Sequence, residues 1–203
     1  MELSKRLKFI IDNIDNTSVL ADIGTDHGYI PLYAVQNGLC SKAIAIDINK
    51  DPLDKAKLNA ILEGAGDELE FRLGNGFKPL EKDEAEVAII AGMGGNLIRD
   101  ILEEDLEKIS SIGYLVLVPA QNPEVLREYL YNNDYEIICE DLCEEEGIYY
   151  ELFKVRKKVG ESVKLDSIYY EVSPKLLMQR HPLMKDYLNS KIENYKRILS
   201  FIT

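Results

Sequence analysis

The chain of 203 residues has no tryptophan, only three cysteines and two histidines, and no apolar run long enough to cross a membrane. Charges interrupt the apolar residues of its N-terminal segment, MELSKRLKFIIDN, which argues against a signal peptide. Cys40, Cys139 and Cys143 cannot all pair with one another, so we expect reduced thiols in a cytoplasmic protein. Neither His27 nor His181 has a companion at metal-ligand spacing, so no metal site is expected.

The chain is also short of basic residues, since 24 Lys and Arg against 36 Asp and Glu give a net charge of −12. Taken alone, this balance argues against a nucleic-acid partner, because phosphates are neutralised by Lys and Arg. The acidic residues are concentrated at 81–86, 100–107 and 140–146, whereas basic residues gather near the N-terminus, at 154–158 and in the tail. Composition therefore still allows a basic strip on an acidic body.

From about residue 18 to 158, short apolar runs alternate with helical stretches, which is typical of a mainly parallel sheet covered on both faces. The runs are too continuous for half-exposed antiparallel strands. We predict strands at 19–24, 43–47, 69–73, 87–91 and 114–118, and helices at 28–37, 52–63, 96–109 and 123–132. Asp51, before Pro52, is predicted to cap its helix.

The alternation ends with two β-prone segments, 135–140 and 148–156, joined by an acidic turn with no helix between them. This pattern predicts a terminal antiparallel hairpin. A parallel sheet that ends in such a hairpin resembles class I S-adenosylmethionine methyltransferases, whereas an ordinary nicotinamide-binding Rossmann sheet lacks it. After Val159 the tail carries apolar residues at helical spacing over 182–202. We therefore predict a Rossmann-like α/β domain over 1–158 and a small helical part over 159–203.

The segment Ala21–Gly28, ADIGTDHG, follows an apolar strand and opens a helix. Its glycines allow a ligand to approach the backbone, but Asp26 stands where the dinucleotide fingerprint has its second glycine. A carboxylate there would repel a pyrophosphate and favour a cationic ligand, and S-adenosylmethionine carries an ammonium and a sulfonium. The alternative is that Asp26 only caps the following helix.

Three other strand ends offer candidate ligand groups. Asp47 lies some twenty residues past the glycine loop, where a carboxylate can accept both ribose hydroxyls, although a lone Asp there is also a common turn former. Asn75 and Phe77 would contact an adenine ring, but Asn-Gly is likewise a common turn. Gly92 and Met93 follow the fourth strand, where donor and acceptor should meet; a loop that needs glycine for its turn is the alternative.

Together these segments resemble the bacterial tRNA (adenine-22-N1)-methyltransferase family. The resemblance covers most of residues 3–158 and is carried by the motifs LSKRL at 3–7, ADIGTDH at 21–27, IAGMGG at 90–95, LREYL at 126–130 and EGIYYE at 146–151. It implies a Rossmann-like catalytic domain, a helical C-terminal part that helps to hold tRNA, and methyl transfer to N1 of an adenine. The tail after Val159 looks shorter than in the family, and Asp47 stands where the family often has Glu.

On this basis we expect S-adenosylmethionine as cofactor, tRNA as partner, no metal, no membrane and a monomer or weak dimer. Catalytic roles are expected for Asp26, Tyr29, Gly92 and Met93, with Tyr29 stacking on the substrate base unless it only packs inside. The cofactor-binding residues are expected to be Asp22, Gly24, Thr25, Asp26, His27, Gly28, Asp47, Ile48, Asn75, Gly76, Phe77, Ala91 and Gly92. The tRNA phosphates are expected to contact Lys5, Arg6, Lys8, Arg156, Lys157, Lys158 and Arg180, with Lys175 and Lys185 beside them.

Two other functions compete with this hypothesis. A small-molecule methyltransferase would suit the acidic charge better. A cofactor-binding or RNA-binding module without turnover would explain why no catalytic base is visible. A nicotinamide dehydrogenase is disfavoured by Asp26 and by the terminal hairpin.

Overall fold

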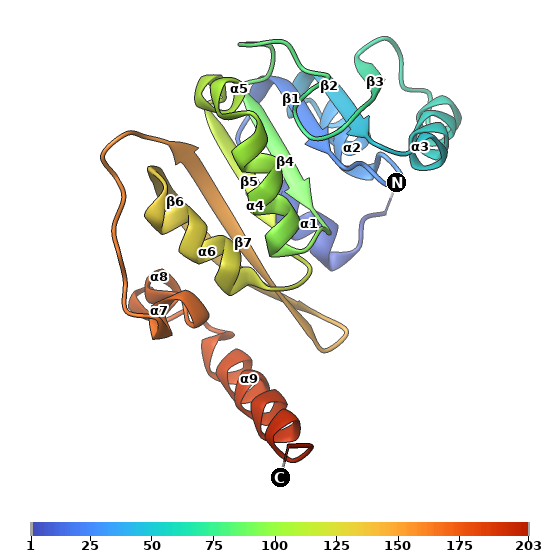
Figure 1. Ribbon diagram of the computed structural model, residues 1–203. Coiled ribbons are helices and arrows are strands. Elements are labelled where there is room, and N and C mark those ends of the chain that lie inside the picture. Colours follow the sequence, from blue (N-terminus) through green and yellow to red (C-terminus); the bar gives the residue numbers. More distant parts are fainter. Residues whose placement is uncertain (1, 203) are drawn as a thin grey trace.

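The computed structural model describes residues 2–202, in which a seven-stranded sheet has the strand order β3-β2-β1-β4-β5-β7-β6. Figure 1 shows this sheet with helices on both of its faces. Strands β1 to β5 are parallel, and β7 pairs antiparallel with both β5 and β6. The strands are β1 (Thr17–Ile23), β2 (Cys40–Asp47), β3 (Leu69–Leu73), β4 (Val87–Ala91), β5 (Tyr114–Val118), β6 (Tyr135–Glu145) and β7 (Ile148–Lys157). The predicted Rossmann-like sheet, mainly parallel with a terminal antiparallel hairpin, is confirmed.

The helices form two layers because the central strands are buried on both faces. One core cluster joins the sheet to α1, α2 and α3, and a second cluster joins the opposite face to α4, α5 and α6. The helices are α1 (Lys5–Ile11), α2 (Tyr29–Gln36), α3 (Lys50–Leu62), α4 (Gly95–Glu104), α5 (Leu106–Ser111), α6 (Pro123–Asn132), α7 (Ile168–Glu171), α8 (Pro174–Met178) and α9 (Met184–Leu199). The continuous apolar runs of β4 and β5, VAIIA and YLVLV, match this two-sided burial.

Two helix predictions were wrong in detail. The single helix expected over 96–109 is broken at Asp105, whose φ of −141° and ψ of 50° lie outside the helical region. After the break Leu106 is exposed and Ile109 is buried. The apolar spacing that suggested one helix therefore belongs to two shorter helices, α4 and α5. Asp51 does not cap α3, because the helix already begins at Lys50 after Asn49 and places Asp51 in its first turn, where its charge suits the helix dipole.

The hairpin is longer than expected, because β6 continues to Glu145. Residues Glu146 and Gly147 form its tip with φ values of 54° and 79°, as a two-residue type I′ turn requires. The Glu144 carboxylate accepts the Gly147 N–H at 2.6 Å. Glu144 and Glu145, which the sequence analysis assigned to an acidic turn, therefore lie in a paired strand. The tip extends beyond the carboxyl end of β5, because Leu117 is already level with Phe153.

A buried charge network fixes the C-terminal part to the sheet. Arg127 of α6 is 0% exposed and donates to the carboxylates of Glu140 on β6 and Glu151 on β7. It also donates to the Tyr170 carbonyl at 2.6 Å, and the Tyr187 hydroxyl of α9 donates to Glu151. One guanidinium thus joins α6, the hairpin, α7 and α9. Such a group is costly to bury and is stable only when its partners are in place.

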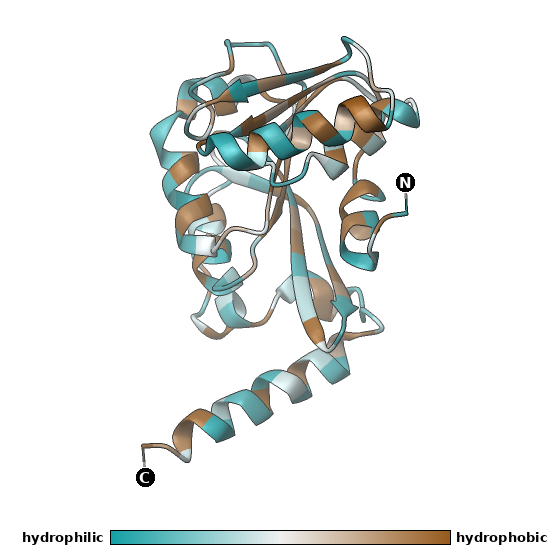
Figure 2. Cartoon of the chain, turned by 90° about the vertical axis from the view of Figure 1, so that its right-hand side faces the viewer, coloured by the Kyte–Doolittle hydropathy of each residue, from teal (hydrophilic) through white to brown (hydrophobic). Residues whose placement is uncertain are grey.

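A small apolar cluster of Leu142, Leu176, Met184 and Tyr187 completes the attachment of the tail to β6. Beyond this cluster α9 extends away from the body of the molecule (Figures 1 and 2). The division at residue 158 stays a prediction. The structure shows that residues after it pack on the hairpin through both polar and apolar contacts.

Candidate active site

The largest cluster of predicted site residues lies where the loops after β1, β2 and β4 meet. β1 lies between β2 and β4 in the sheet, so the three loops are neighbours at the carboxyl edge, the usual ligand position of open α/β sheets. They enclose a cavity of about 420 Å³. Its lining residues are Arg6, Asp22, Gly24, Thr25, Asp26, His27, Gly28, Tyr29, Ile30, Asp47, Ala91, Gly92 and Met93.

A smaller, mostly apolar cavity of about 150 Å³ adjoins it and shares Gly24, Asp47 and Met93 with it. The residues around this slot are Ile23, Gly24, Asp47, Ile48, Gly74, Asn75, Gly76, Met93, Leu97 and Ile101. A polar chamber and an apolar slot therefore meet at Asp47. That combination suits a ligand with one charged end and one flat apolar end.

Gly24 is required at the boundary between the two cavities. Its φ of 79° favours glycine, and a Cβ placed on it would lie 2.0 Å from Cε of Met93. The loop is held by backbone hydrogen bonds from Gly24 and Thr25 to the Ile46 carbonyl, at 2.7 and 2.9 Å. The chain therefore leaves space for a ligand at the end of β1 by omitting a side chain there.

Two buried carboxylates face this space without a basic partner. Asp22 is 6% exposed, and burial together with the Asp47 carboxylate raises the pKa of Asp22 to about 6. Asp47 is 9% exposed, and its Oδ1 accepts the Asn49 N–H at 2.6 Å. Within residues 2–202 neither carboxylate forms an ion pair with Lys, Arg or His. The Thr25 hydroxyl is buried beside Asp22 and lowers the pKa of that carboxyl against the larger effect of burial. The cavity thus presents polar groups that the protein itself does not satisfy.

Asp26, His27 and Tyr29 form the rim of the polar chamber. The Asp26 side chain is 73% exposed, and its Oδ2 lies 3.3 Å from His27 Nε2. The His27 ring stacks on Tyr29, with ring centroids 5.4 Å apart. Helix α2 begins at Tyr29 after Gly28 and has no side-chain cap bond, so the alternative that Asp26 caps it is wrong. Tyr29 is 39% exposed rather than packed inside, and its ring is available to a ligand.

The structure corrects one expected contact and adds others. Phe77 is 1% exposed, packs in the hydrophobic core and lines neither cavity, so its expected contact with an adenine ring is wrong. Its size and apolarity favour the interior over the loop surface. Leu97 and Ile101 of α4 line the slot instead. Their helical spacing after the loop at 92–95 was the signal that could have identified them.

The predicted tRNA-binding residues are not brought together. Lys5, Arg6 and Lys8 lie on α1, beside the polar chamber, where Lys5 Nζ is 3.5 Å from Glu144. Residues 156–158 lie at the opposite edge of the sheet, because Val155 is already level with Leu115 near the start of β5. There Arg156 and Lys158 pair with Glu136 at 2.6 and 3.4 Å.

The other cations of this set are also dispersed. The Lys157 Nζ lies 4.5 Å from the centre of the Tyr135 ring. Arg180 is exposed after α8, with a left-handed φ of 51°.

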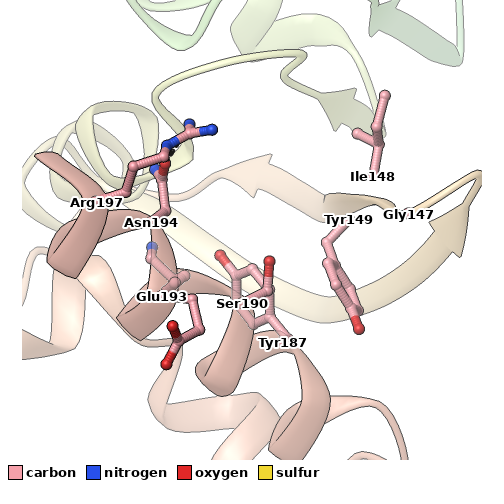
Figure 3. A pocket seen from close by; sticks show the side chains of 9 residues that line it. Gly147, Ile148, Tyr149, Tyr187, Ser190, Glu193, Asn194 and Arg197 are labelled. Atoms are coloured by element: carbon pink, nitrogen blue, oxygen red, sulfur yellow. Dashed lines mark hydrogen bonds between the residues drawn. The ribbon is translucent and has the colours of Figure 1, made fainter.

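A third cavity, of about 490 Å³, separates the hairpin tip from α9 (Figure 3). Tyr149 and Tyr187 lie close at its base, with ring centroids 5.4 Å apart. The other lining residues are Gly147, Ile148, Ser190, Lys191, Glu193, Asn194 and Arg197. The hairpin tip thus has α1 and the polar chamber near one side and this groove on another.

Across residues 2–202, no group of three or more His, Cys, Asp or Glu side chains is arranged to hold a metal ion. No helix in the same stretch is long and apolar enough to span a membrane. The three cysteines are free thiols, and burial raises the pKa of Cys40 to about 11.

Comparison with known proteins adds sequence and structural relatives. A family model described as tRNA (adenine(22)-N(1))-methyltransferase matches residues 20–203. A Bacillus subtilis protein of that description is 39% identical over 173 residues, which cover 85% of this chain and 71% of the relative. The crystal structure of a Bacillus subtilis m1A22 tRNA methyltransferase has 33% identity and a TM-score of 0.86, and covers 99% of this chain and 87% of its own. A Streptococcus pneumoniae structure in complex with S-adenosyl-L-methionine has 31% identity and a TM-score of 0.89, with 97% and 91% covered.

Proposed function

We propose, because this chain belongs to the tRNA (adenine(22)-N(1))-methyltransferase family, that its carboxyl-edge cavity is where a methyl group passes from S-adenosylmethionine to adenine 22 of a tRNA. The reaction of the family is methyl transfer to N1 of that adenine, and this chain is an S-adenosylmethionine-dependent enzyme of that class. A tRNA substrate implies work in the cytoplasm. A monomer or weak dimer stays a prediction.

The observation that carries the site assignment is the pair of buried carboxylates without basic partners next to an apolar slot. S-adenosylmethionine has an ammonium and a sulfonium at one end and adenosine at the other. Asp22 matches the cationic end, and the buried Thr25 hydroxyl beside it offers a further polar contact. Asp47, at the junction of the two cavities, matches the ribose hydroxyls, and the slot beside Ile48, Asn75 and Leu97 matches the adenine.

The residues present do not need to supply a general base. Adenine N1 is a neutral nitrogen with a free lone pair, and the sulfonium supplies an electrophilic methyl group when the donor is bound. The chain therefore has to align the two partners, to within about 3–3.5 Å for such a transfer. Met93 and Gly92, which line the chamber, are the groups that shape this position. The product base is cationic, and the carboxylate of Asp26 or the Gly92 carbonyl can stabilise it.

The target base must leave its pair or be unpaired already, because N1 lies on the pairing edge. The stacked pair of His27 and Tyr29 at the rim supplies an aromatic surface for such a base. Asp26 holds His27 through the 3.3 Å contact, which keeps the His27 ring parallel to Tyr29 within 20°. These three residues therefore act as a platform for the acceptor.

The grip on the rest of the tRNA is proposed to come from α1, the hairpin tip and the groove beside α9. Lys5 and Lys8 lie on α1, whose Arg6 lines the chamber, and Lys191 and Arg197 line the groove. With a net charge of −12, binding through these few cations must be local. We therefore expect tRNA affinity to fall as salt rises.

The decisive experiment incubates the protein with unmodified tRNA and isotopically labelled S-adenosylmethionine, then maps the methylated adenine. A tRNA in which adenine 22 is replaced by guanine is the matched control. Label at N1 of adenine 22, and none in the control, is the expected result. Label transferred only to a metabolite extract would favour a small-molecule methyltransferase. Cofactor binding without any product would favour a module without turnover.

A further inference from the structure

Arg6 occupies an unexpected place for a surface cation. It lies on the first helix, α1, yet it is half-buried and lines the polar chamber together with the loops after β1 and β4. A Cβ placed on Gly92 would lie 3.8 Å from Arg6 Nη1, so the guanidinium reaches the loop where donor and acceptor should meet. Among the described residues that line this chamber, Arg6 is the one Lys or Arg.

The position of Arg6 is fixed by the hairpin tip. Its backbone N–H donates to Glu145 at 3.0 Å, and its guanidinium carbon lies 5.4 Å from the centre of the Tyr150 ring. The neighbouring Lys5 pairs with Glu144, and the Ser4 hydroxyl caps α1 by accepting the Leu7 N–H. These contacts hold the backbone and one face of the guanidinium. They leave its N–H groups without a carboxylate partner among the described residues.

A half-buried guanidinium without a carboxylate partner is suited to bind an anion, which would accept its hydrogen bonds and neutralise its charge. Most other arginines of the chain have a carboxylate partner, including Arg72 with Glu84 and Arg99 with Asp100. The amino-acid end of the methyl donor carries both an ammonium and a carboxylate. Asp22 suits the first group, but a carboxylate next to Asp22 would be repelled unless a cation stood opposite it.

We propose that Arg6 binds the α-carboxylate of the methyl donor, and that it therefore belongs to the cofactor site rather than to the tRNA surface. This inference rests on the proposed function. A guanidinium can bind two carboxylate oxygens at once, which would fix the orientation of the amino-acid end and thereby the direction of the methyl group. The hairpin tip, through Glu145 and Tyr150, then acts as the support of a cofactor contact.

The test compares two ligands that differ only in this carboxylate: S-adenosylhomocysteine and its decarboxylated analogue. Their affinities are measured by calorimetry for the wild type, Arg6→Gln and Arg6→Lys. Arg6→Gln should weaken S-adenosylhomocysteine about 10- to 100-fold, the range for a hydrogen-bonded charge, and should leave the analogue unchanged. Arg6→Lys should recover part of the loss. Lys164→Gln, an exposed cation in the tail, removes the same charge and should change neither affinity.

Three outcomes would overturn the inference. An unchanged affinity for S-adenosylhomocysteine in Arg6→Gln would exclude the contact. An equal loss for both ligands would show that Arg6 only supports the packing of α1. Unchanged affinity with a raised KM for tRNA would assign Arg6 to a phosphate of the target nucleotide. In each case a wild type that binds S-adenosylhomocysteine and methylates adenine 22 leaves the proposed function intact, whereas a wild type that does neither refutes that function instead.

Discussion

Two regions of this molecule bury acidic side chains, but only one of them pairs these side chains with a basic residue. Around Arg127, the carboxylates of Glu140 and Glu151 are 1% and 3% exposed, and one guanidinium binds both. At the end of β1, Asp22 is 6% exposed and no basic side chain of residues 2–202 pairs with it. The first region supplies a cation for both of its carboxylates. The second leaves its negative charge for something the protein does not contain.

The difference separates structural charge from functional charge. A buried network that contains its own cation is stable only with that cation in place, and so fixes helices to a sheet. A buried carboxylate without a cation lowers the stability of the empty protein, and that cost falls when a cationic ligand binds. The same residue type therefore serves attachment of the tail in one place and recognition of a ligand in the other, and substitutions should distinguish the two.

The largest effect on stability is expected from Arg127→Met. This change leaves Glu140 and Glu151 buried without their cation, which should lower the free energy of unfolding by about 3–5 kcal/mol. Urea denaturation at pH 7.5 measures it. The matched control is Arg156→Met, which breaks the exposed pair with Glu136 and should lower the free energy of unfolding far less, because water already screens that pair. If the two variants lose similar amounts, the Arg127 network does not hold the tail.

Asp22→Asn should change stability in the opposite direction. Burial raises the pKa of Asp22 from 3.8 to about 6, so the ionised form is disfavoured in the folded protein. The folded protein therefore holds this proton more tightly than the unfolded chain does. The contribution of Asp22 to the free energy of unfolding is most favourable below pH 3.8 and falls as the pH rises to about 6. Above that pH the free energy of unfolding is lower by roughly 3 kcal/mol. Asparagine keeps the shape without the charge, so the ligand-free variant should be more stable at pH 7.5 by up to this amount.

The same variant should bind S-adenosylhomocysteine more weakly, since the charge that destabilises the empty cavity is the one that attracts the ligand. Calorimetry and urea denaturation of one preparation measure both effects. If Asp22→Asn is less stable than the wild type and binds S-adenosylhomocysteine normally, the Asp22 charge is structural, as the charges around Arg127 are.

Sequence alone predicted the sheet because its signal is strong. Val87–Ala91 and Tyr114–Val118 are continuous apolar runs, and their predicted bounds agree with β4 and β5. Positions that depend on long-range partners were harder to place. Asp105 breaks a helix whose apolar spacing looks unbroken, and β6 continues through Asp141, Glu144 and Glu145 because β7 pairs with them.

The candidate site shows the same limit. The sequence identified the loop at 21–28 but placed its electrostatic weight on Asp26, whose side chain is 73% exposed. Asp22 has no local feature that distinguishes it; only the closing of β2 and β4 around it buries its carboxylate. From the sequence Arg6 was likewise expected to be a surface cation. Its backbone contact with the hairpin is to Glu145, which lies 139 residues away in the chain.

A smaller effect follows from pH. If the ligand ammonium binds ionised Asp22, binding must favour the carboxylate form and therefore lower the pKa of Asp22 from about 6 in the empty cavity. The affinity of wild type for S-adenosylhomocysteine should then fall about tenfold between pH 7.5 and pH 5, as Asp22 becomes protonated. Asp22→Asn should bind weakly across this range with little pH dependence. A wild-type affinity that is flat over these pH values would show that Asp22 is not the group that binds the ammonium.

The smallest effect is expected where cations are already paired at the sheet edge away from the cavity. Arg156 and Lys158 share Glu136, so a tRNA phosphate would have to displace an existing partner, and Arg156→Gln should change the KM for tRNA less than about twofold. Lys8→Gln removes a cation of α1 that has no such pair among residues 2–202, and should reduce the salt dependence of tRNA binding by about one phosphate contact. The dissociation constants of the two variants for tRNA, measured across a salt series, test both expectations. A steeper loss in Arg156→Gln than in Lys8→Gln would mean that tRNA crosses both edges of the sheet, and that pairing within the protein does not predict which charges a substrate uses.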